Sequence, residues 1–166
     1  TMNRSSNRYE YLDFRVLIGG KVADGYLVTV VESPAGEGEA HCQFQLNDEL
    51  GARLNEIAAH QLSTEELTAF GSHLFRALFT DDLLILYHTS LGIVRREAKG
   101  LRLRLWISAP ELAALPWEYL YDPSEGISLA TSPETALVRH VPLRLSARPT
   151  LIQLPLRVLV VIANPS

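Results

Sequence analysis

A histidine and a cysteine stand side by side at positions 41 and 42, and an imidazole with a thiol is the pair that cysteine hydrolases use as base and nucleophile. Residues 40–46 alternate polar and apolar side chains, which predicts a β-strand. Because successive side chains on a strand point to opposite faces, His41 and Cys42 point apart. Cys42 shares its face with Phe44 and Leu46, so the pattern predicts a buried structural cysteine and no catalytic thiol.

The other residue types that could carry chemistry are scattered. Histidines occur at 60, 73, 88 and 140, and none of them forms a His-x-x-x-His pair or neighbours a cysteine. No serine lies in a Gly-x-Ser-x-Gly setting, and the glycines in "LIGGKVADG" lack the spacing of a phosphate-binding loop. We therefore expect no catalytic residue, no metal ligand and no cofactor in this chain.

An aromatic stretch, "LPWEYLYDP" at 115–123, allows two interpretations. Trp117, Tyr119 and Tyr121 could line a pocket in which Glu118 acts as an acid, alone or with a histidine, in a small hydrolase. A single glutamate without a charged partner supports catalysis only weakly. Aromatic side chains bury large areas, so the pattern favours a packing joint that delivers Trp117 into the core.

A basic cluster precedes that stretch. It consists of Arg95, Arg96, Lys99, Arg102 and Arg104. One interpretation is a site for phosphate, because clustered cations attract anions. The simpler interpretation is the basic end of a helix followed by the solvent-facing side of a strand.

Regular elements must position these residues. Alternation predicts strands at 11–18, 26–32 and 40–46, joined by short turns, which indicates an antiparallel meander. Helical spacing predicts three helices: 48–61, one opened by the capping box "STEE" at 63–66, and one from Asp81 that ends near Arg96. A strand at 101–107, a short helix at 110–115 and extended segments at 127–131 and 135–141 follow.

The last residues differ from the rest. Residues 142–155 are rich in proline, and residues 156–166 contain a continuous β-branched run, which is typical of a strand buried on both faces. We expect a disordered N-terminus at 1–8, an α/β accessory domain at 9–141, a connector at 142–155 and the first strand of a following unit at 156–166. The predicted fold is α/β with a mixed sheet: an antiparallel three-stranded meander, three central helices and a C-terminal buried strand.

Composition narrows the class of protein. A length of 166 residues fits one domain, and a net charge of −4 disfavours nucleic acid as a partner. A single cysteine rules out an internal disulfide. No apolar run reaches the roughly 20 residues of a membrane span, and the N-terminus lacks the apolar core of a signal peptide. The sequence therefore predicts a cytoplasmic protein that does not associate with membranes.

Three stretches resemble a known family. They are "GLRLRLWISAPELAALPWEYLYDP", "ISLATSPETALVRHVPL" and "PLRVLVVIANPS", which are similar to the N-terminal side of bacterial CHAT domains. These are caspase-like, separase-related cysteine peptidases that are often joined to TPR repeats or nucleotide-binding modules. The resemblance implies a caspase-like unit downstream, with a catalytic histidine before a glycine and a later cysteine. No histidine here precedes a glycine and the only cysteine lies before the similar region, so no catalytic residue is carried over.

The resemblance leads to a functional expectation. The chain is expected to be a non-catalytic scaffold or regulatory region that braces the C-terminal protease half of the same protein, with TPR or nucleotide-binding sensor modules as further partners. The candidate interface residues are Trp117, Glu118, Tyr119, Arg102 and Arg104. The alternative is a peptide- or phosphate-binding module that uses the aromatic patch at 115–123 or the basic patch at 95–104.

Overall fold

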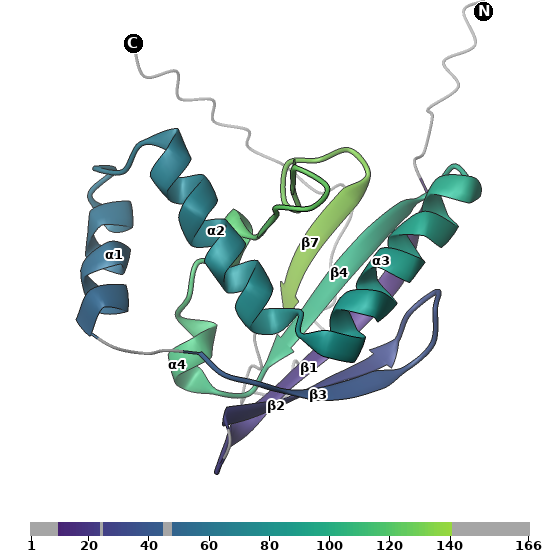
Figure 1. The fold of residues 1–166 in the computed structure, drawn as a ribbon, viewed down its shortest axis with the longest axis horizontal. Coiled ribbons are helices and arrows are strands. Elements are labelled where there is room, and N and C mark those ends of the chain that lie inside the picture. Colours follow the sequence, from purple (N-terminus) through teal and green to yellow (C-terminus); the bar gives the residue numbers. More distant parts are fainter. Residues whose placement is uncertain (1–9, 24, 45–47, 141–166) are drawn as a thin grey trace, which may run out of the picture.

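A five-stranded mixed sheet forms the centre of the molecule. The computed structural model describes residues 10–23, 25–44 and 48–140. The strand order is β3-β2-β1-β4-β7 (Figure 1). The bounds are β1 (Tyr11–Val22), β2 (Gly25–Glu32), β3 (Gly38–Cys42), β4 (Gly100–Ile107) and β7 (Thr135–His140). β1, β2 and β3 pair antiparallel, whereas β1, β4 and β7 pair parallel. The predicted α/β class, mixed sheet and N-terminal meander are confirmed.

The helices and one small hairpin fill the connections. They are α1 (Asp48–Ala58), α2 (Thr64–Leu78), α3 (Asp81–Arg96), α4 (Pro110–Ala113), the 3₁₀ turn η1 (Trp117–Tyr119), and the hairpin strands β5 (Tyr121–Asp122) and β6 (Ile127–Ser128). All three predicted central helices are present. In Figure 1, α3 lies over the sheet, α2 runs beside it and meets α3 at its end, and α1 lies beside α2 and away from the strands. α2 packs on η1 and β5.

Local hydrogen bonds explain where the elements begin and end. The capping box that opens α2 is confirmed: the Ser63 hydroxyl accepts from the Glu66 amide, and the Glu66 carboxylate accepts from the Ser63 amide at 2.9 Å. The extended segment predicted at 127–131 shrinks to Ile127–Ser128, because the Ser132 amide turns back onto the Ser128 carbonyl at 2.9 Å. The predicted third strand ends early, at Cys42.

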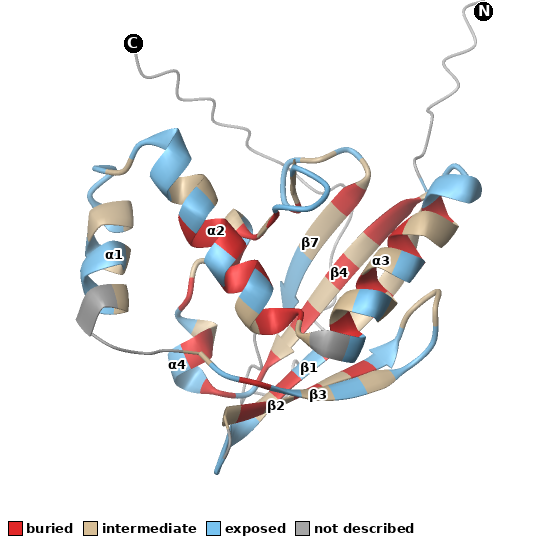
Figure 2. Cartoon of the chain, in the orientation of Figure 1, coloured by how far each residue is buried: buried red, intermediate tan, exposed pale blue. Residues whose placement is uncertain are grey.

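The core lies between one face of the sheet and helices α2 and α3 (Figure 2). Phe14 of β1 meets Tyr87 of α3 edge-on, with ring centroids 6.1 Å apart. Tyr87 also contacts Phe75 and Phe79, so four aromatic rings join both helices to the sheet. Cys42 is fully buried at the edge of this core, where its thiol donates to the Leu78 carbonyl at 3.1 Å. The prediction that Cys42 is a core residue is confirmed.

The opposite face of the sheet has no described helix over it. Its outward-pointing side chains alternate with the buried ones along each strand and remain partly exposed. We call this surface the open face; its members are Asp13, Arg15, Leu17, Thr29, Glu39, Arg102, Arg104, Trp106, Val138 and His140. Leu17 on the central strand β1 is 39% exposed, and Val138 on the edge strand β7 is 40% exposed.

Three parts of the predicted organisation lie outside the described residues: the N-terminus at 1–8, the connector at 142–155 and the strand at 156–166. Within the described part, no single helix is long and apolar enough to cross a membrane. The pair of α2 and α3 meets the length and composition only when it is taken together, across a bend of 110°.

Candidate functional site

The register of the parallel strands brings the open face together. Asp13 lies opposite Arg102, Arg15 opposite Arg104, and Leu17 opposite Trp106 across β1 and β4. On the other side of β4, Val138 of β7 lies opposite Arg104, and His140 lies opposite Trp106. The face therefore has a charged end and an aromatic end, separated by a few residues along each strand.

Asp13 is the centre of the charged end. Its two carboxylate oxygens accept from Arg102 Nε at 2.5 Å and from Arg104 Nη1 at 3.0 Å, and Arg15 lies 3.5 Å away. Partial burial works to raise the pKa of Asp13, but the bonds from the two β4 arginines outweigh it and hold the pKa below its usual range. Arg15 also reaches Glu32 at 2.9 Å, so each of these three arginines has an acidic partner.

The other end of the open face is aromatic and apolar. The Arg104 guanidinium carbon lies 5.1 Å from the centre of the Trp106 ring, within the range of a cation–π contact. The Trp106 ring also stacks on His140, with centroids 4.7 Å apart. Leu17 and Val138 flank this stack with exposed apolar surface. A surface with paired charges at one end and exposed apolar groups at the other is suited to docking a polypeptide.

The five candidate interface residues do not form one patch. Arg102 and Arg104 lie on the open face, whereas η1 holds the other three on the helical side of the sheet. Trp117 has no exposed surface: its indole donates to the Leu112 carbonyl at 2.7 Å. Trp117 therefore acts as the predicted packing joint, and no other molecule can contact it in this conformation. Glu118 is exposed and lies 3.4 Å from Arg139, and Tyr119 is half-buried.

The basic cluster at 95–104 is also divided. Arg95, at the end of α3, bonds Glu125 at 2.7 Å and Glu134 at 2.8 Å. Lys99 lies 3.1 Å from Glu97 and 3.4 Å from Glu10, while Arg102 and Arg104 point to the other face of the sheet. These four cations already have carboxylate partners and offer little free positive charge to a phosphate group, which leaves Arg96, exposed at the end of α3, as the member of the cluster for which the structure gives no partner.

The fold also creates a cluster of three polar side chains that the sequence did not reveal. His88 of α3 lies 3.0 Å from Asp122 Oδ2 and 3.1 Å from the Ser124 hydroxyl. A serine, a histidine and an aspartate are the members of a hydrolytic triad. The sequence separation of 34 to 36 residues hid the cluster, although the "DPSEG" turn that carries Asp122 and Ser124 is visible in the sequence.

The geometry of this cluster is that of a structural clamp. In a triad, the carboxylate bonds one ring nitrogen and the serine bonds the other. Here both contact Nε2 of His88, and the Ser124 hydroxyl donates its proton to Asp122 Oδ1 at 2.6 Å. The backbone amides of Ser124 and Glu125 also donate to Asp122. Burial works to raise the pKa of Asp122, and these hydrogen bonds lower it below its usual range.

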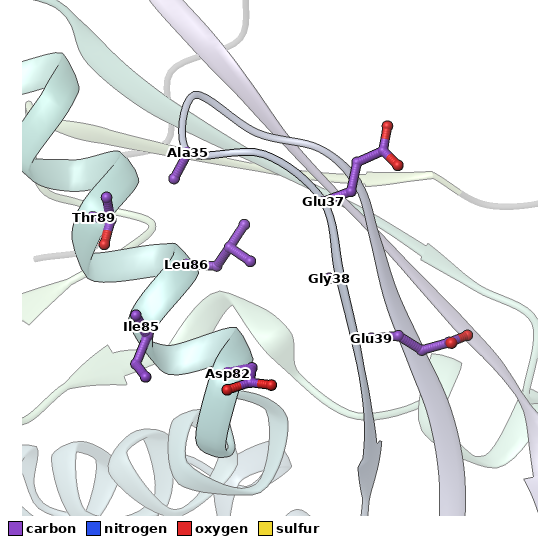
Figure 3. Close-up of a pocket in the computed structure, with 8 residues that line it drawn as sticks. All are labelled: Ala35, Glu37, Gly38, Glu39, Asp82, Ile85, Leu86 and Thr89. Atoms are coloured by element: carbon purple, nitrogen blue, oxygen red, sulfur yellow. The ribbon is translucent and has the colours of Figure 1, made fainter.

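A shallow pocket of about 330 Å³ lies between α3 and the turn that joins β2 to β3. Figure 3 shows Leu86 pointing from the helix toward that turn, while Glu37 and Glu39 point away from the helix. Gly38 permits the close approach, because a Cβ atom there would lie 2.8 Å from Leu86 Cδ1. The polar groups do not converge on the pocket, so it does not have the character of a catalytic site.

The remaining candidate residues lie apart. His41 is exposed on the face of β3 opposite Cys42, as the alternation predicted. His73 is exposed on α2, and His60 follows α1 in a left-handed conformation with φ of 55°. The described residues contain no group of three or more histidine, cysteine or acidic side chains that could hold a metal ion.

The comparisons with known proteins give no family assignment. No family model matches the chain, and no curated protein or solved structure matches it either.

Proposed function

We propose that this chain is a non-catalytic scaffold region of a larger protein of the CHAT family, and that the open face receives the protease half. The observation that carries this proposal is that one face of the parallel strands β1, β4 and β7 has no described helix over it and keeps its side chains partly exposed. Sheets made only of parallel strands are almost always covered on both faces, and the three parallel strands of this mixed sheet have a described cover on one face only. We therefore expect another structure to lie against the open face.

The chemistry of the described residues supports a role without catalysis. The thiol of Cys42 is fully buried and bonded to a backbone carbonyl, and His41 lies on the other face of its strand. Ser124 is exposed, but its proton is held by Asp122 and not by His88. The class of the partner comes from the sequence resemblance, which also implies TPR or nucleotide-binding sensor modules elsewhere in the protein.

The alternative, a peptide- or phosphate-binding module, has less support. A phosphate group at Arg102 and Arg104 must displace Asp13, whose carboxylate already bonds both guanidinium groups. A peptide at the 115–123 stretch cannot reach Trp117, which has no exposed surface.

The first test is to read the coding sequence beyond Ser166 and to express the continuous protein. We expect a His-Gly and a later cysteine, each after an apolar strand, and peptide cleavage that is lost when that downstream cysteine is replaced. Cys42→Ala should leave cleavage intact, because its thiol is buried. Absence of those motifs, or cleavage of a peptide library by residues 1–166 alone, contradicts the proposal.

The second test asks whether the open face is the docking surface. In the continuous protein, Leu17→Glu places a charge in the apolar end of the open face, so we expect peptidase activity to fall. Ile85→Glu is the matched control, because Ile85 is 65% exposed on α3 and lies away from this face. Equal activity of the two variants contradicts docking at the open face.

A further inference from the structure

The strand β7 is held in the sheet differently from its neighbours. β1 and β4 each bury three or more apolar side chains in the core. β7 lies at the edge of the sheet and pairs only with β4 among the described strands (Figure 1). Its only buried side chain is that of Thr135, which is polar; Leu137 is half-buried, and residues 138–140 are exposed. We therefore expect β7 to separate from the sheet at a lower cost in free energy than β1 or β4, because it buries less apolar surface.

A single arginine ties down the segment that leads into β7. We call residues 121–134, which contain the β5–β6 hairpin, the strap. Arg95, at the end of α3, donates from Nη1 to Glu125 Oε2 at 2.7 Å, and from Nε and Nη2 to Glu134 Oε2 at 3.0 and 2.8 Å. Glu134 directly precedes β7. The side chain of Arg95 therefore ties both the hairpin and the start of β7 to α3.

Two contacts from other elements flank the start of β7. One is the contact between Arg95 and Glu134, and the other is the hydrogen bond from the Tyr11 hydroxyl to the Pro133 carbonyl at 3.1 Å. The contact of Arg95 is the stronger of the two, because it joins charged groups through two N–H donors. Arg95 and its two carboxylate partners are 33% to 40% exposed to water, so the contact is sensitive to salt.

We propose that Arg95 is a latch that keeps β7 in the sheet, and that the strap and β7 open as one unit when the latch is released. Val138 and His140 of β7 belong to the open face, where the His140 ring stacks on Trp106. Opening removes these two side chains from the open face and exposes the edge of β4.

The latch couples the two sides of the sheet. A partner that contacts β7 on the open face favours the closed latch, although Arg95 extends from α3 on the opposite side. This coupling to a partner rests on the proposed function, whereas the latch itself does not.

Hydrogen exchange in the chain of residues 1–166 tests the latch. Arg95→Ala removes all three donors, and we expect the amides of residues 134–140 to exchange roughly three- to tenfold faster than in the wild type at neutral pH. Exchange in β2 should not change, because β1 and β4 separate β2 from β7. Arg96→Ala is the matched control: Arg96 is the next residue of α3, it is exposed, and the described structure gives it no partner. Mass spectrometry of proteolytic fragments measures both regions.

Salt distinguishes an electrostatic latch from a loss of packing. An increase in NaCl from about 0.05 M to about 1 M screens the ion pairs, and we expect it to speed exchange at residues 134–140 of the wild type by about two- to threefold relative to β2. The same increase should have little effect on Arg95→Ala.

A second variant tests the same contact from the other side. Glu134→Gln should reproduce most of the effect of Arg95→Ala and add nothing when the two are combined, because both remove one interaction. Circular dichroism checks that each variant is folded, and Glu134→Gln carries the test if Arg95→Ala does not fold.

Three results would overturn the inference. The first is equal exchange at residues 134–140 in Arg95→Ala and Arg96→Ala. The second is an equal rise in β2 and in residues 134–140, because Arg95 then stabilises the whole domain and not a local unit. The third is a salt response as large in Arg95→Ala as in the wild type. These measurements use no partner and do not depend on motifs beyond Ser166, so failure of the latch and failure of the proposed function are distinguishable.

Discussion

On β1, Phe14, Val16 and Ile18 are buried in the core, while Asp13, Arg15 and Leu17, which alternate with them, remain partly exposed on the open face. The covered face is mainly apolar and holds four interlocked aromatic rings. The open face mixes an arginine–aspartate cluster with apolar groups. This difference indicates that the covered face holds the domain together, and that the open face is available for an intermolecular or intramolecular contact.

The strongest test of this difference compares two positions on the same strand, one on each face. Phe14→Ala should lower the free energy of unfolding by about 3–5 kcal/mol, because it removes a buried ring and leaves a cavity. Leu17→Ala should lower it by about 1 kcal/mol or less if the open face contributes little to folding. Urea denaturation at neutral pH measures both. Equal losses would mean that the open face is as much a part of the core as the covered face.

A substitution at the joint between α2 and η1 should give the next largest loss of stability. A Cβ atom at Gly71 would lie 1.8 Å from the Tyr119 carbonyl oxygen, whereas one at Gly92 in α3 would have no neighbour within 4 Å. We expect Gly71→Ala to cost about 1–3 kcal/mol through overpacking, although alanine is the better helix former. Gly92→Ala should gain up to about 1 kcal/mol. Thermal unfolding of the pair measures the difference, and stabilisation by both changes would exclude a tight joint.

The charged end of the open face should contribute less to the free energy of unfolding than the buried core or the joint between α2 and η1. Asp13→Asn removes the carboxylate that Arg102 and Arg104 share, and we expect a loss of about 1 kcal/mol at pH 7, because the arginines remain partly exposed to water. Glu32→Gln, which breaks one exposed pair with Arg15, should cost under about 0.5 kcal/mol.

The pH dependence sharpens that prediction. The pKa of Asp13 is lowered in the folded protein, so its contribution is present above the pKa of the unfolded chain, near 4, and is lost as the pH falls through the folded value. The loss caused by Asp13→Asn should therefore shrink below about pH 4. A difference that stays constant down to pH 2 would mean that the ion pairs do not cause the effect.

Most of the fold was predictable because it depends on local patterns. Alternation along 101–107 placed the leucines inward and Arg102 and Arg104 outward, and the capping box fixed the start of α2. The pairing of Asp13 with Arg102 was not predictable, since it depends on the parallel register of strands about 90 residues apart. The burial of Trp117 was predicted from its aromatic character, whereas its inclusion in an interface treated a packing residue as a surface residue.

A small effect on stability is also expected at the clamp formed by His88, Asp122 and Ser124, on the covered side of the sheet. Ser124→Ala removes the hydroxyl that donates to Asp122, but the backbone amides of Ser124 and Glu125 still donate to that carboxylate. The loss of stability should therefore be about 0.5–1.5 kcal/mol. Because the serine proton is held by Asp122, the wild-type chain should not react with a fluorophosphonate probe. Labelling that depends on both Ser124 and His88 would mean that this cluster is a hydrolytic site. The covered side of the sheet would then carry catalytic chemistry, which contradicts the assignment of a purely structural role to it.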